Sequence, residues 1–548
     1  MSKLIKPAEM LTGTSYKPPE KGWMDVKPEL RPGTYCNAAS TKWLEWIDYP
    51  YPREWSPANE DWKLPDNWKE IILEGIEDRL NRFRSLRLFF DICVRCGACA
   101  DKCHFFLGTG DPKNMPVLRA ELLRSVYRRY FKKIGRVLGE IAGARDLTED
   151  VIKEWFLYLH QCTICRRCSL FCPYGIDMAE MTLLGRELLS SIGLNIDWAM
   201  ASVAQCYDKG SHIGATPQAF KDMIDFLAEE NERITGITTT PSYNRKGAEI
   251  LFITPSGDYF ADPGTYTLMG YLLLFEYLGL DYTFSTYAAE GGNFGWFVSH
   301  EMGKRLNAKM YAEAERLGVK WILGGECGHM WRVCNQYMPT YYGKPVDFLE
   351  EPVSPITGTR FENAKIHKMV HISEFTADLI KNGKLNLDPQ RNAHIKLTFH
   401  DSCNPARGFG MFEEPRYIIN NVLPEGNFFE MPPNTIREKT FCCGSSAGLN
   451  ASENMEVRMQ GGMPRANAVR FVHEKYGVNH LGCICALDRA TLPTLLQYWV
   501  PEVDVTGISE LVGNALIFPD EIERTTDLRD RPLVGFEEAA EEDAEEGE

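Results

Sequence analysis

The chain has 548 residues, of which 44% are hydrophobic and 25% charged, the composition of a globular protein long enough for several domains. Its net charge of −16 speaks against nucleic-acid binding, which requires a basic face. No stretch reaches the roughly 18 uninterrupted apolar residues of a transmembrane helix, and the N-terminus shows no export signal. Seventeen cysteines in such a chain indicate metal ligation in a reducing compartment, not disulfides.

Residues 1–68 form the first predicted segment, which is rich in Pro, Trp, Tyr and charged residues. A segment of this composition cannot build a core of its own. We expect it to run extended over a neighbouring domain or subunit, with its aromatic side chains as anchors. Cys36 stands alone in this segment, and we expect it to bind no metal.

A predicted helix over residues 69–92 leads into the first of two cysteine runs. The first run has the spacing C-x2-C-x2-C-x3-C, and the second repeats it and ends before Pro173. In this bacterial ferredoxin pattern the first three cysteines of a run bind one [4Fe–4S] cluster and the fourth binds the other. The predicted ligands are Cys93, Cys96, Cys99 and Cys172 for the first cluster, and Cys162, Cys165, Cys168 and Cys103 for the second.

Residues 69–245 are predicted to form one helical domain around these two clusters. The 58 residues between the runs read as helices, which resembles the all-helical ferredoxin domain of succinate dehydrogenase. One of these helices is basic. It is either a docking face for an acidic partner or anionic lipid, or an ordinary solvated face. Its basic residues are Arg119, Arg124, Arg128, Arg129, Lys132, Lys133 and Arg136.

After residue 245 the pattern alternates between strands and helices, which predicts parallel sheets wound with helices. Strands are expected at 249–256, 280–286, 319–328, 395–403, 426–432 and 479–487, and helices at 265–280 and 417–424. The expected fold class is therefore α+β and multidomain, with a helical two-cluster ferredoxin domain followed by two α/β repeats, over 246–392 and 393–519. The acidic residues 520–548 have no apolar face and are expected to form a disordered tail.

The second predicted repeat carries five cysteines in the pattern C-x38-CC-x39-C-x-C. Adjacent cysteines cannot easily pair in a disulfide, and soft thiolates select iron–sulfur clusters, zinc or Cu(I). Each thiol follows a predicted parallel strand, so all five are expected to meet at one edge of the sheet, where such folds bind ligands. The expected catalytic residues are Cys403, Cys442, Cys443, Cys483 and Cys485, with His400 as a hydrogen-bond donor or a plain structural histidine.

The first predicted repeat lacks most of these thiols. Aligning the two repeats sets Gly257, Glu290, Gly291 and Gly325 against cysteines of the second, and only Cys327 keeps its thiol. This repeat is expected to hold no cluster alone and to form one wall of a cleft over the other. The residues on that wall are Cys327, His329 and Cys334, with Cys327 either an extra ligand, a substrate-facing thiol or a structural relic.

The two ferredoxin runs followed by two CCG-type repeats resemble the catalytic subunit of membrane-bound heterodisulfide reductase over roughly residues 80–510. The chain most resembles the DsrK-type iron–sulfur subunits of the membrane complex linked to dissimilatory sulfite reductase. The closing C-x-C differs from the usual C-x2-C of heterodisulfide reductase. That departure leaves open whether the third cluster is noncubane or a modified [4Fe–4S] cluster.

The resemblance implies a function in dissimilatory sulfur metabolism. It implies disulfide or trisulfide chemistry on the sulfur carrier DsrC, and electron exchange with menaquinol through an integral-membrane haem b subunit and further subunits of the complex. The protein would then lie on the cytoplasmic side of the membrane, attached through these partners.

Two other functions fit the same residues. In one, the protein only passes electrons, as the iron–sulfur subunit of a flavin-dependent hydroxyacid or glycerol-3-phosphate dehydrogenase. In the other, it is an assembly subunit whose five-cysteine motif holds zinc. The sequence has no G-x-G-x-x-G after a strand, so no nicotinamide or flavin site is expected in this chain.

Overall fold

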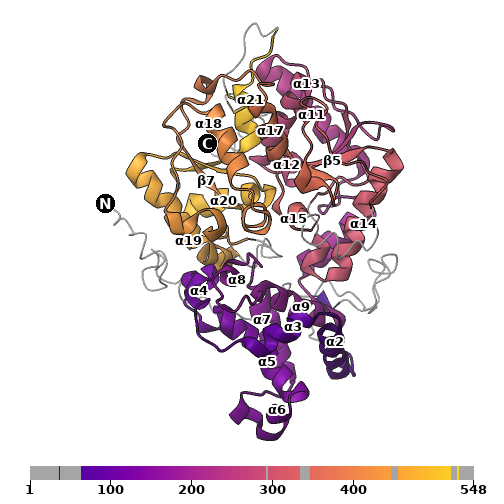
Figure 1. Ribbon diagram of the computed structural model, residues 1–548, viewed down its shortest axis with the longest axis vertical. Helices are drawn as coiled ribbons and strands as arrows, with labels where there is room; N and C mark the ends of the chain where they lie inside the picture. Colours follow the sequence, from indigo (N-terminus) through magenta and orange to yellow (C-terminus); the bar gives the residue numbers. More distant parts are fainter. Residues whose placement is uncertain are drawn as a thin grey trace, which may run out of the picture.

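The structure is a computed structural model that describes residues 63–291, 294–333, 346–445, 455–519 and 527–529, together with the backbone of Cys36–Asn37 (Figure 1). The predicted extended segment and acidic tail lie almost wholly outside these ranges. Cys36–Asn37 forms the short strand β1, which pairs antiparallel with β2 (Leu194–Asn195).

The chain from Trp68 to Thr235 is helical, as expected. The single helix expected over 69–92 is two helices, because extended backbone at Phe83 ends one and begins the next. The basic helix likewise ends at Phe131 and a shorter helix follows. The helices are α2 (Trp68–Arg82), α3 (Arg84–Ile92), α4 (His104–Thr109), α5 (Pro116–Phe131), α6 (Lys133–Leu138), α7 (Glu149–His160), α8 (Arg167–Leu170), α9 (Met178–Ser191), α10 (Asp197–Lys209) and α11 (Pro217–Thr235).

The core of this helical part lies between α5, α7 and α9. Helix α7 shows why: its apolar residues recur at helical spacing, so that Ile152, Trp155 and Leu159 fall on one face, and all three are fully buried. Helix α9 is buried along its whole length between α2, α5 and α7. The first cysteine run lies between α3 and α4, and the second lies between α7 and α9, where it includes the short helix α8.

The rest of the chain forms two parallel sheets. One has the strand order β4-β3-β5-β6 and the other β7-β8-β9. The strand expected over 426–432 is wrong: only Phe428 makes a bridge, to Leu397. Strands β6 and β9 were not expected. The strands are β3 (Ile250–Ile253), β4 (Tyr282–Thr283), β5 (Trp321–Gly324), β6 (Met369–His371), β7 (Leu397–His400), β8 (His480–Cys483) and β9 (Asp504–Gly507).

Helices cover both sheets and join them. The apolar helix α13 packs against α21, so the two sheets share one core. The covering helices are α12 (Gly257–Phe260), α13 (Gly264–Leu278), α14 (His300–Leu317), α15 (Gly328–Trp331), α17 (Ile372–Lys381), α18 (Glu413–Val422), α19 (Met455–Tyr476), α20 (Ala486–Trp499) and α21 (Ile508–Ala515).

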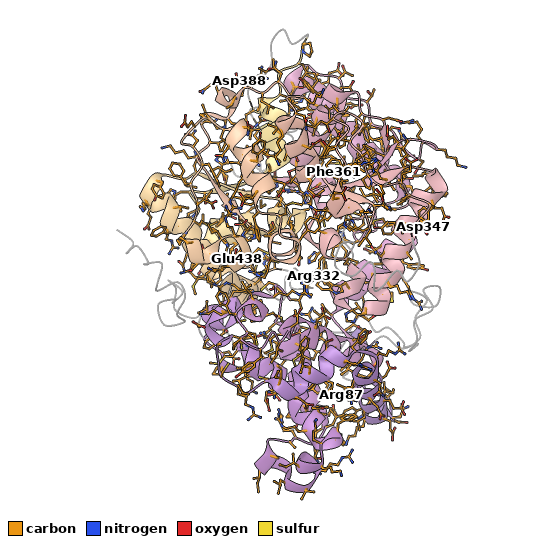
Figure 2. All side chains as sticks on the ribbon, viewed as in Figure 1. Arg87, Arg332, Asp347, Phe361, Asp388 and Glu438 are labelled. Carbon is orange, nitrogen blue, oxygen red and sulfur yellow. The ribbon has the colours of Figure 1, made fainter. Side chains whose placement is uncertain are left out.

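The helical part and the sheet-containing part meet along one boundary, and Figure 1 shows the first at one end of the molecule. Helix α4 packs against α19 there, and the ring of His104 bonds the carbonyl oxygen of Gly461 at 2.8 Å. Arg332, labelled at this boundary in Figure 2, donates to the carbonyl of Ile164 and to Asn404. Within the described ranges, the helices are all too short or too polar to cross a bilayer.

Candidate functional site

The two ferredoxin-type cysteine runs form loops of the same backbone shape. In the first loop Arg95 and Gly97, on either side of the second cysteine, have φ of 58° and 79°. In the second loop Ile164 and Arg166 occupy the same places with φ of 51° and 64°. Left-handed backbone at non-glycine residues is strained and concentrates at functional sites. The runs therefore share conformation as well as spacing.

The fourth cysteine of each run lies beside the other run. Burial, with the nearby thiol of Cys172, raises the pKa of Cys99 to about 11. Burial likewise raises the pKa of Cys168, and here the nearby thiols are those of Cys162 and Cys103. In the predicted ligand sets the fourth cysteine of each run binds the cluster of the other run, which requires this proximity. Those ligand sets remain our proposal.

A buried guanidinium lies against the second group of cysteines. Arg119 of α5 hydrogen-bonds Cys103, and the charges of Cys162 and Cys168 also act on it. Its other bonds go to the carbonyl oxygen of Tyr158 at 2.9 Å and to an asparagine side chain. A buried positive charge at this point suits a group of thiolates, whose charge is negative.

The five-cysteine motif lies at the carboxyl ends of β7 and β8, apart from its central pair. Cys403 follows β7, Cys483 ends β8, and Cys485 caps α20. The pair Cys442–Cys443 follows no strand and stands in a loop, which corrects the expectation that every thiol follows a strand. Gly444, with φ of 91°, turns this loop where a Cβ atom would lie 2.8 Å from backbone atoms of α19.

Three thiols surround the sulfur of Cys442. Close interactions with the thiols of Cys165, Cys403 and Cys443 hold the pKa of Cys442 well below its usual value, although burial opposes them. The same interactions with Cys442, together with burial, raise the pKa of Cys165, Cys403 and Cys443. Cys165 belongs to the second ferredoxin run, so a residue expected at the second cubane touches the five-cysteine motif.

Cys483 and Cys485 complete the motif around a buried carboxylate. Burial raises the pKa of both thiols, and the charge of Asp488 raises it further. Asp488 also hydrogen-bonds Cys443, so it connects the two subsets of the motif. Its place three residues beyond Cys485, at the start of α20, brings it to the strand ends.

Cys327 of the first sheet lies next to Cys485. Burial raises the pKa of Cys327 to about 12, and the charge of Cys327 acts on Cys485 in turn. The backbone N–H of Gly328 donates to the sulfur of Cys485 at 3.4 Å. The first sheet thus contributes a thiol and a backbone donor at the motif. Cys334 lies outside the described residues.

Two histidines lie at the motif. His400 Nε2 is 3.3 Å from the carboxylate of Asp488. Burial would raise the pKa of Asp488, but the nearby charge of His400 outweighs it, and the pKa is lowered. His400 Nδ1 is buried and has no hydrogen-bond partner in the part of the chain described. Burial lowers the pKa of His329 to about 4, with Arg332, Asp488 and Cys442 as nearby charges.

Arg167 and Arg407 each donate hydrogen bonds to backbone carbonyls on the opposite side of the boundary. Arg167, from the helical part, donates to the carbonyl oxygens of Lys439 and Asn434 at 2.8 and 3.2 Å. Arg407, from the sheet-containing part, donates to the carbonyl oxygen of Cys165. We call these two residues the arginine bridge. It fixes the second ferredoxin loop against the loop of Cys442.

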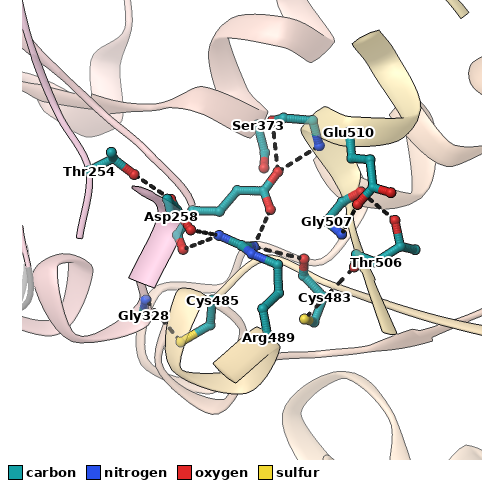
Figure 3. A network of polar contacts seen from close by, with 12 residues as sticks. Thr254, Asp258, Gly328, Ser373, Cys483, Cys485, Arg489, Thr506, Gly507 and Glu510 are labelled. Atoms are coloured by element: carbon teal, nitrogen blue, oxygen red, sulfur yellow. Dashed lines mark hydrogen bonds and ion pairs between the residues drawn. The ribbon is translucent and has the colours of Figure 1, made fainter. Parts of the chain in front are cut away.

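A second buried arginine ties the two sheets together (Figure 3). Arg489 of α20 forms ion pairs with Asp258 and with Glu326, the latter at 2.5 Å, and all three side chains are fully buried. It also lies 3.4 Å from the carbonyl oxygen of Cys483. Glu326 accepts further bonds from Ser509 at 2.7 and 2.8 Å. The turn that carries Cys483 and Cys485 is therefore held against the first sheet.

The donor set suits an iron–sulfur cluster. Buried thiols gather around one low-pKa sulfur, and soft sulfur ligands of this kind bind such clusters. Over the ranges described, no three His, Cys, Asp or Glu side chains converge tightly enough for a single metal ion. The unpartnered nitrogen of His400 offers a further polar contact to a group bound there.

Sequence reasoning missed several residues of this site. These are Asp488, Arg407 and Arg167, together with the place of Cys165 beside Cys442. An acid three residues beyond the closing C-x-C was the signal that could have indicated Asp488. The arginines carry no local pattern, because each acts on a segment far away in the sequence.

Comparison with known proteins gives consistent matches. Residues 90–176 match the 4Fe-4S dicluster domain family. The chain is 49% identical to the Hdr-like menaquinol oxidoreductase iron-sulfur subunit of Archaeoglobus profundus, over 87% of this chain and 88% of that protein. It is 50% identical to Hdr-like menaquinol oxidoreductase iron-sulfur subunit 2 of Archaeoglobus fulgidus, over 89% and 91%.

A more distant relative extends the comparison. It is a subunit of the dihydromethanophenazine:CoB–CoM heterodisulfide reductase of Methanosarcina barkeri, and it is 24% identical over 66% of this chain and 79% of its own length. No solved structure matches the chain.

Proposed function

Since the chain belongs to the family of Hdr-like menaquinol oxidoreductase iron–sulfur subunits, we propose that it is the catalytic iron–sulfur subunit of a membrane complex. The complex exchanges electrons between menaquinol, through a membrane-embedded haem b subunit, and a disulfide or trisulfide. Within the family we assign the chain to the DsrK type, with the sulfur carrier DsrC as substrate and the cytoplasmic side as its location.

The contact between Cys165 and Cys442 is the observation that carries this proposal. Reduction of a disulfide consumes two electrons and two protons and releases two thiols. Ferredoxin-type clusters carry one electron at a time. A ferredoxin ligand in contact with the five-cysteine motif gives those electrons a direct route to the place where sulfur chemistry is expected.

The residues that would hold the clusters fall in three sets. Cys93, Cys96, Cys99 and Cys172 hold the first [4Fe–4S] cluster, and Cys162, Cys165, Cys168 and Cys103 hold the second. Cys403, Cys442, Cys443, Cys483 and Cys485 hold the third, which is noncubane or a modified [4Fe–4S] cluster. When bound, the third cluster supplies electrons and an iron that can take a substrate sulfur.

The surrounding residues prepare this site for sulfur chemistry. Cys442 and Cys443 are almost wholly buried, so water is excluded from the pair. His400 holds the carboxylate of Asp488 in place beside Cys443. Cys327 and His329 face the motif from the first sheet, where they would line the path of the substrate.

Replacing Cys443 with Ala tests the proposal. We expect the rate of disulfide reduction with a soluble electron donor to fall at least about hundredfold, since a sulfur ligand of the third cluster is lost. Iron content should fall from about twelve to about eight atoms per chain, because each four-iron cluster contributes four. Both ferredoxin signals should survive in electron paramagnetic resonance.

The matched control is Cys206→Ala, which removes a buried thiol outside the three ligand sets. It should change neither iron content nor disulfide reduction. Full activity of the Cys443→Ala protein would rule out the assigned site. A loss of zinc in place of iron would support the assembly-subunit alternative.

A further inference from the structure

The helical part ends in a projection that carries exposed aliphatic side chains. It consists of α6 and the 3-10 turn after it, residues 132–143, and we call it the tip. Figure 1 shows α6 beyond α5, at the end of the molecule away from the sheets. The exposed fractions of its aliphatic residues are 61% for Ile134, 81% for Val137, 45% for Leu138 and 88% for Ile141.

The tip is held in a fixed shape. Gly135 lets α6 approach the end of α5 so closely that a Cβ atom there would lie 2.1 Å from the carbonyl oxygen of Arg128. The Arg128 side chain donates to the carbonyl of Gly143 at 2.6 Å, and Arg136 donates to that of Tyr130 at 2.9 Å. These contacts fix the conformation of the tip, so its four aliphatic side chains are held in position while exposed to solvent.

Positive charge surrounds these aliphatic residues. Residues 129–146 contain five basic and two acidic side chains, a net charge of +3 in a chain whose total is −16. Lys133 and Arg136 are exposed, and neither forms an ion pair with any residue that the structure describes. Two of the seven basic residues predicted as a docking face, Arg119 and Arg124, are instead buried.

We propose that the tip inserts its aliphatic side chains into the surface of an anionic lipid bilayer, with Lys133 and Arg136 at the lipid phosphates. Exposed aliphatic residues collared by basic ones are the chemistry of interfacial membrane anchors. A protein partner is disfavoured, because the cores of protein interfaces are enriched in aromatic residues, Met and Arg, whereas the apolar residues of the tip are all aliphatic.

The tip also lies beside the first ferredoxin loop. The guanidinium of Arg95 comes within 3.2 Å of the point where a Cβ atom on Gly143 would stand, and Cys96, next in sequence, is exposed. A tip seated in lipid therefore turns the first cluster toward the membrane. This part of the inference rests on the proposed function, in which a membrane subunit exchanges electrons with that cluster.

Flotation of the iron-loaded full-length chain with lipid vesicles tests the proposal. We expect the chain to float with vesicles of phosphatidylglycerol and to float far less with phosphatidylcholine alone or at high salt. The variant Val137→Ser/Ile141→Ser should bind vesicles about tenfold more weakly, since it removes two aliphatic side chains that would be buried in the bilayer. Lys133→Glu should also weaken binding. The matched control Ile366→Ser changes an isoleucine of similar exposure far from the tip, and should bind as the parent does.

Results other than those expected above would overturn the proposal that the tip binds lipid. Equal flotation of the parent and the Val137→Ser/Ile141→Ser variant, or no flotation of either, would do so. If the variant instead failed to assemble with the membrane subunits while the parent bound no vesicles, the tip would be a protein-docking surface. Disulfide reduction with a soluble donor should be unchanged in all tip variants, so a failure of the proposed function shows separately.

Discussion

At the scale of single residues, the arginines at the boundary decide how the second ferredoxin loop meets the five-cysteine motif. Arg407 bonds the carbonyls of Cys165 and Glu438, and its charge acts on the thiols of both Cys165 and Cys403. Its hydrogen bonds within the described chain go to backbone carbonyls, so its charge remains available to the thiolates. Burial, together with the charges of Arg407 and Arg465, lowers the pKa of Arg167 to about 10.

Replacing Arg407 with Gln should lower the reduction potentials of the second cluster, proposed to be bound at Cys165, and of the proposed third cluster beside it. One buried positive charge is removed beside negative clusters, and we expect a shift of about 60 mV, or tenfold in a one-electron equilibrium. A redox titration followed by electron paramagnetic resonance measures it. Arg407→Lys keeps the charge and should shift the potential much less. Equal shifts in both variants would assign the effect to the lost hydrogen bonds.

At the scale of elements, the turn from β8 into α20 depends on charges supplied by the other sheet. Arg489 reaches Asp258 on α12 and Glu326 after β5, and it also contacts the carbonyl of Cys483. The three charged side chains replace part of an apolar core between the sheets. Such a buried network costs desolvation energy and is sensitive to the loss of any member.

Arg489→Met should therefore destabilise the protein by about 3–5 kcal/mol, because two buried carboxylates lose their counter-charge. Thermal unfolding of the iron-loaded chain, followed by circular dichroism, measures the change. Adding Asp258→Asn and Glu326→Gln to the same chain should recover much of the loss. No recovery in the triple variant would mean that packing, and not charge, sets the cost.

A pH-dependent contact joins α14 to the helical part. His300 lies 3.4 Å from Glu187 and 3.5 Å from Glu180, both on α9. Burial would lower the pKa of His300, but hydrogen bonds and charge from the two glutamates outweigh it and raise the pKa to about 9. The folded pKa lies above the ordinary value of 6.5, so the stabilisation is complete below pH 6.5 and disappears as the pH rises through about 9.

His300→Gln should accordingly lower the stability at pH 6 by about 3 kcal/mol, since each pKa unit is worth about 1.4 kcal/mol. The difference from the parent should shrink toward zero near pH 9.5. Unfolding temperatures of both proteins across this range provide the measurement. A difference in unfolding temperature that stays constant with pH would contradict the assignment of the stabilisation to protonated His300.

At the scale of the whole molecule, three groups of cysteines follow one another from the tip to the sheets. The first loop contains the exposed Cys96, and the second places Cys165 against Cys442 at the boundary. In the proposed function, electrons therefore enter at the first ferredoxin loop near the tip, and the sulfur chemistry takes place at the five-cysteine motif. The arginine bridge keeps the last two groups in contact.

Cys96→Ser should separate electron delivery from substrate binding. The variant loses a proposed ligand of the first cluster, so we expect quinol-driven turnover in the assembled complex to fall at least about hundredfold. The affinity for the oxidised sulfur carrier, measured by calorimetry, should stay within about twofold of the parent value. The proposed substrate site is at the five-cysteine motif, far from Cys96 in the first ferredoxin loop. An equal loss of binding would place Cys96 in the substrate site and contradict the order proposed.

Features that depend on spacing along the chain could be predicted from the amino-acid sequence alone. The ferredoxin runs are regular, so their two loops and the dicluster domain could be predicted. The alternation after residue 245 predicted parallel sheets, which the structure confirms. The strand expected over 426–432 failed, because apolar residues there pack without pairing beyond Phe428, and β6 is too short to show a period.

Contacts between residues far apart in the sequence could not be predicted and became apparent from the folded chain. Arg407 and Cys165 lie 242 residues apart, and no local pattern relates them. The same holds for Cys165 beside Cys442, Cys327 beside Cys485, and Arg489 between two acids of the other sheet. Periodicity reports which face of an element is buried, but the packing of one element on another depends on side-chain shape and charge across the whole core.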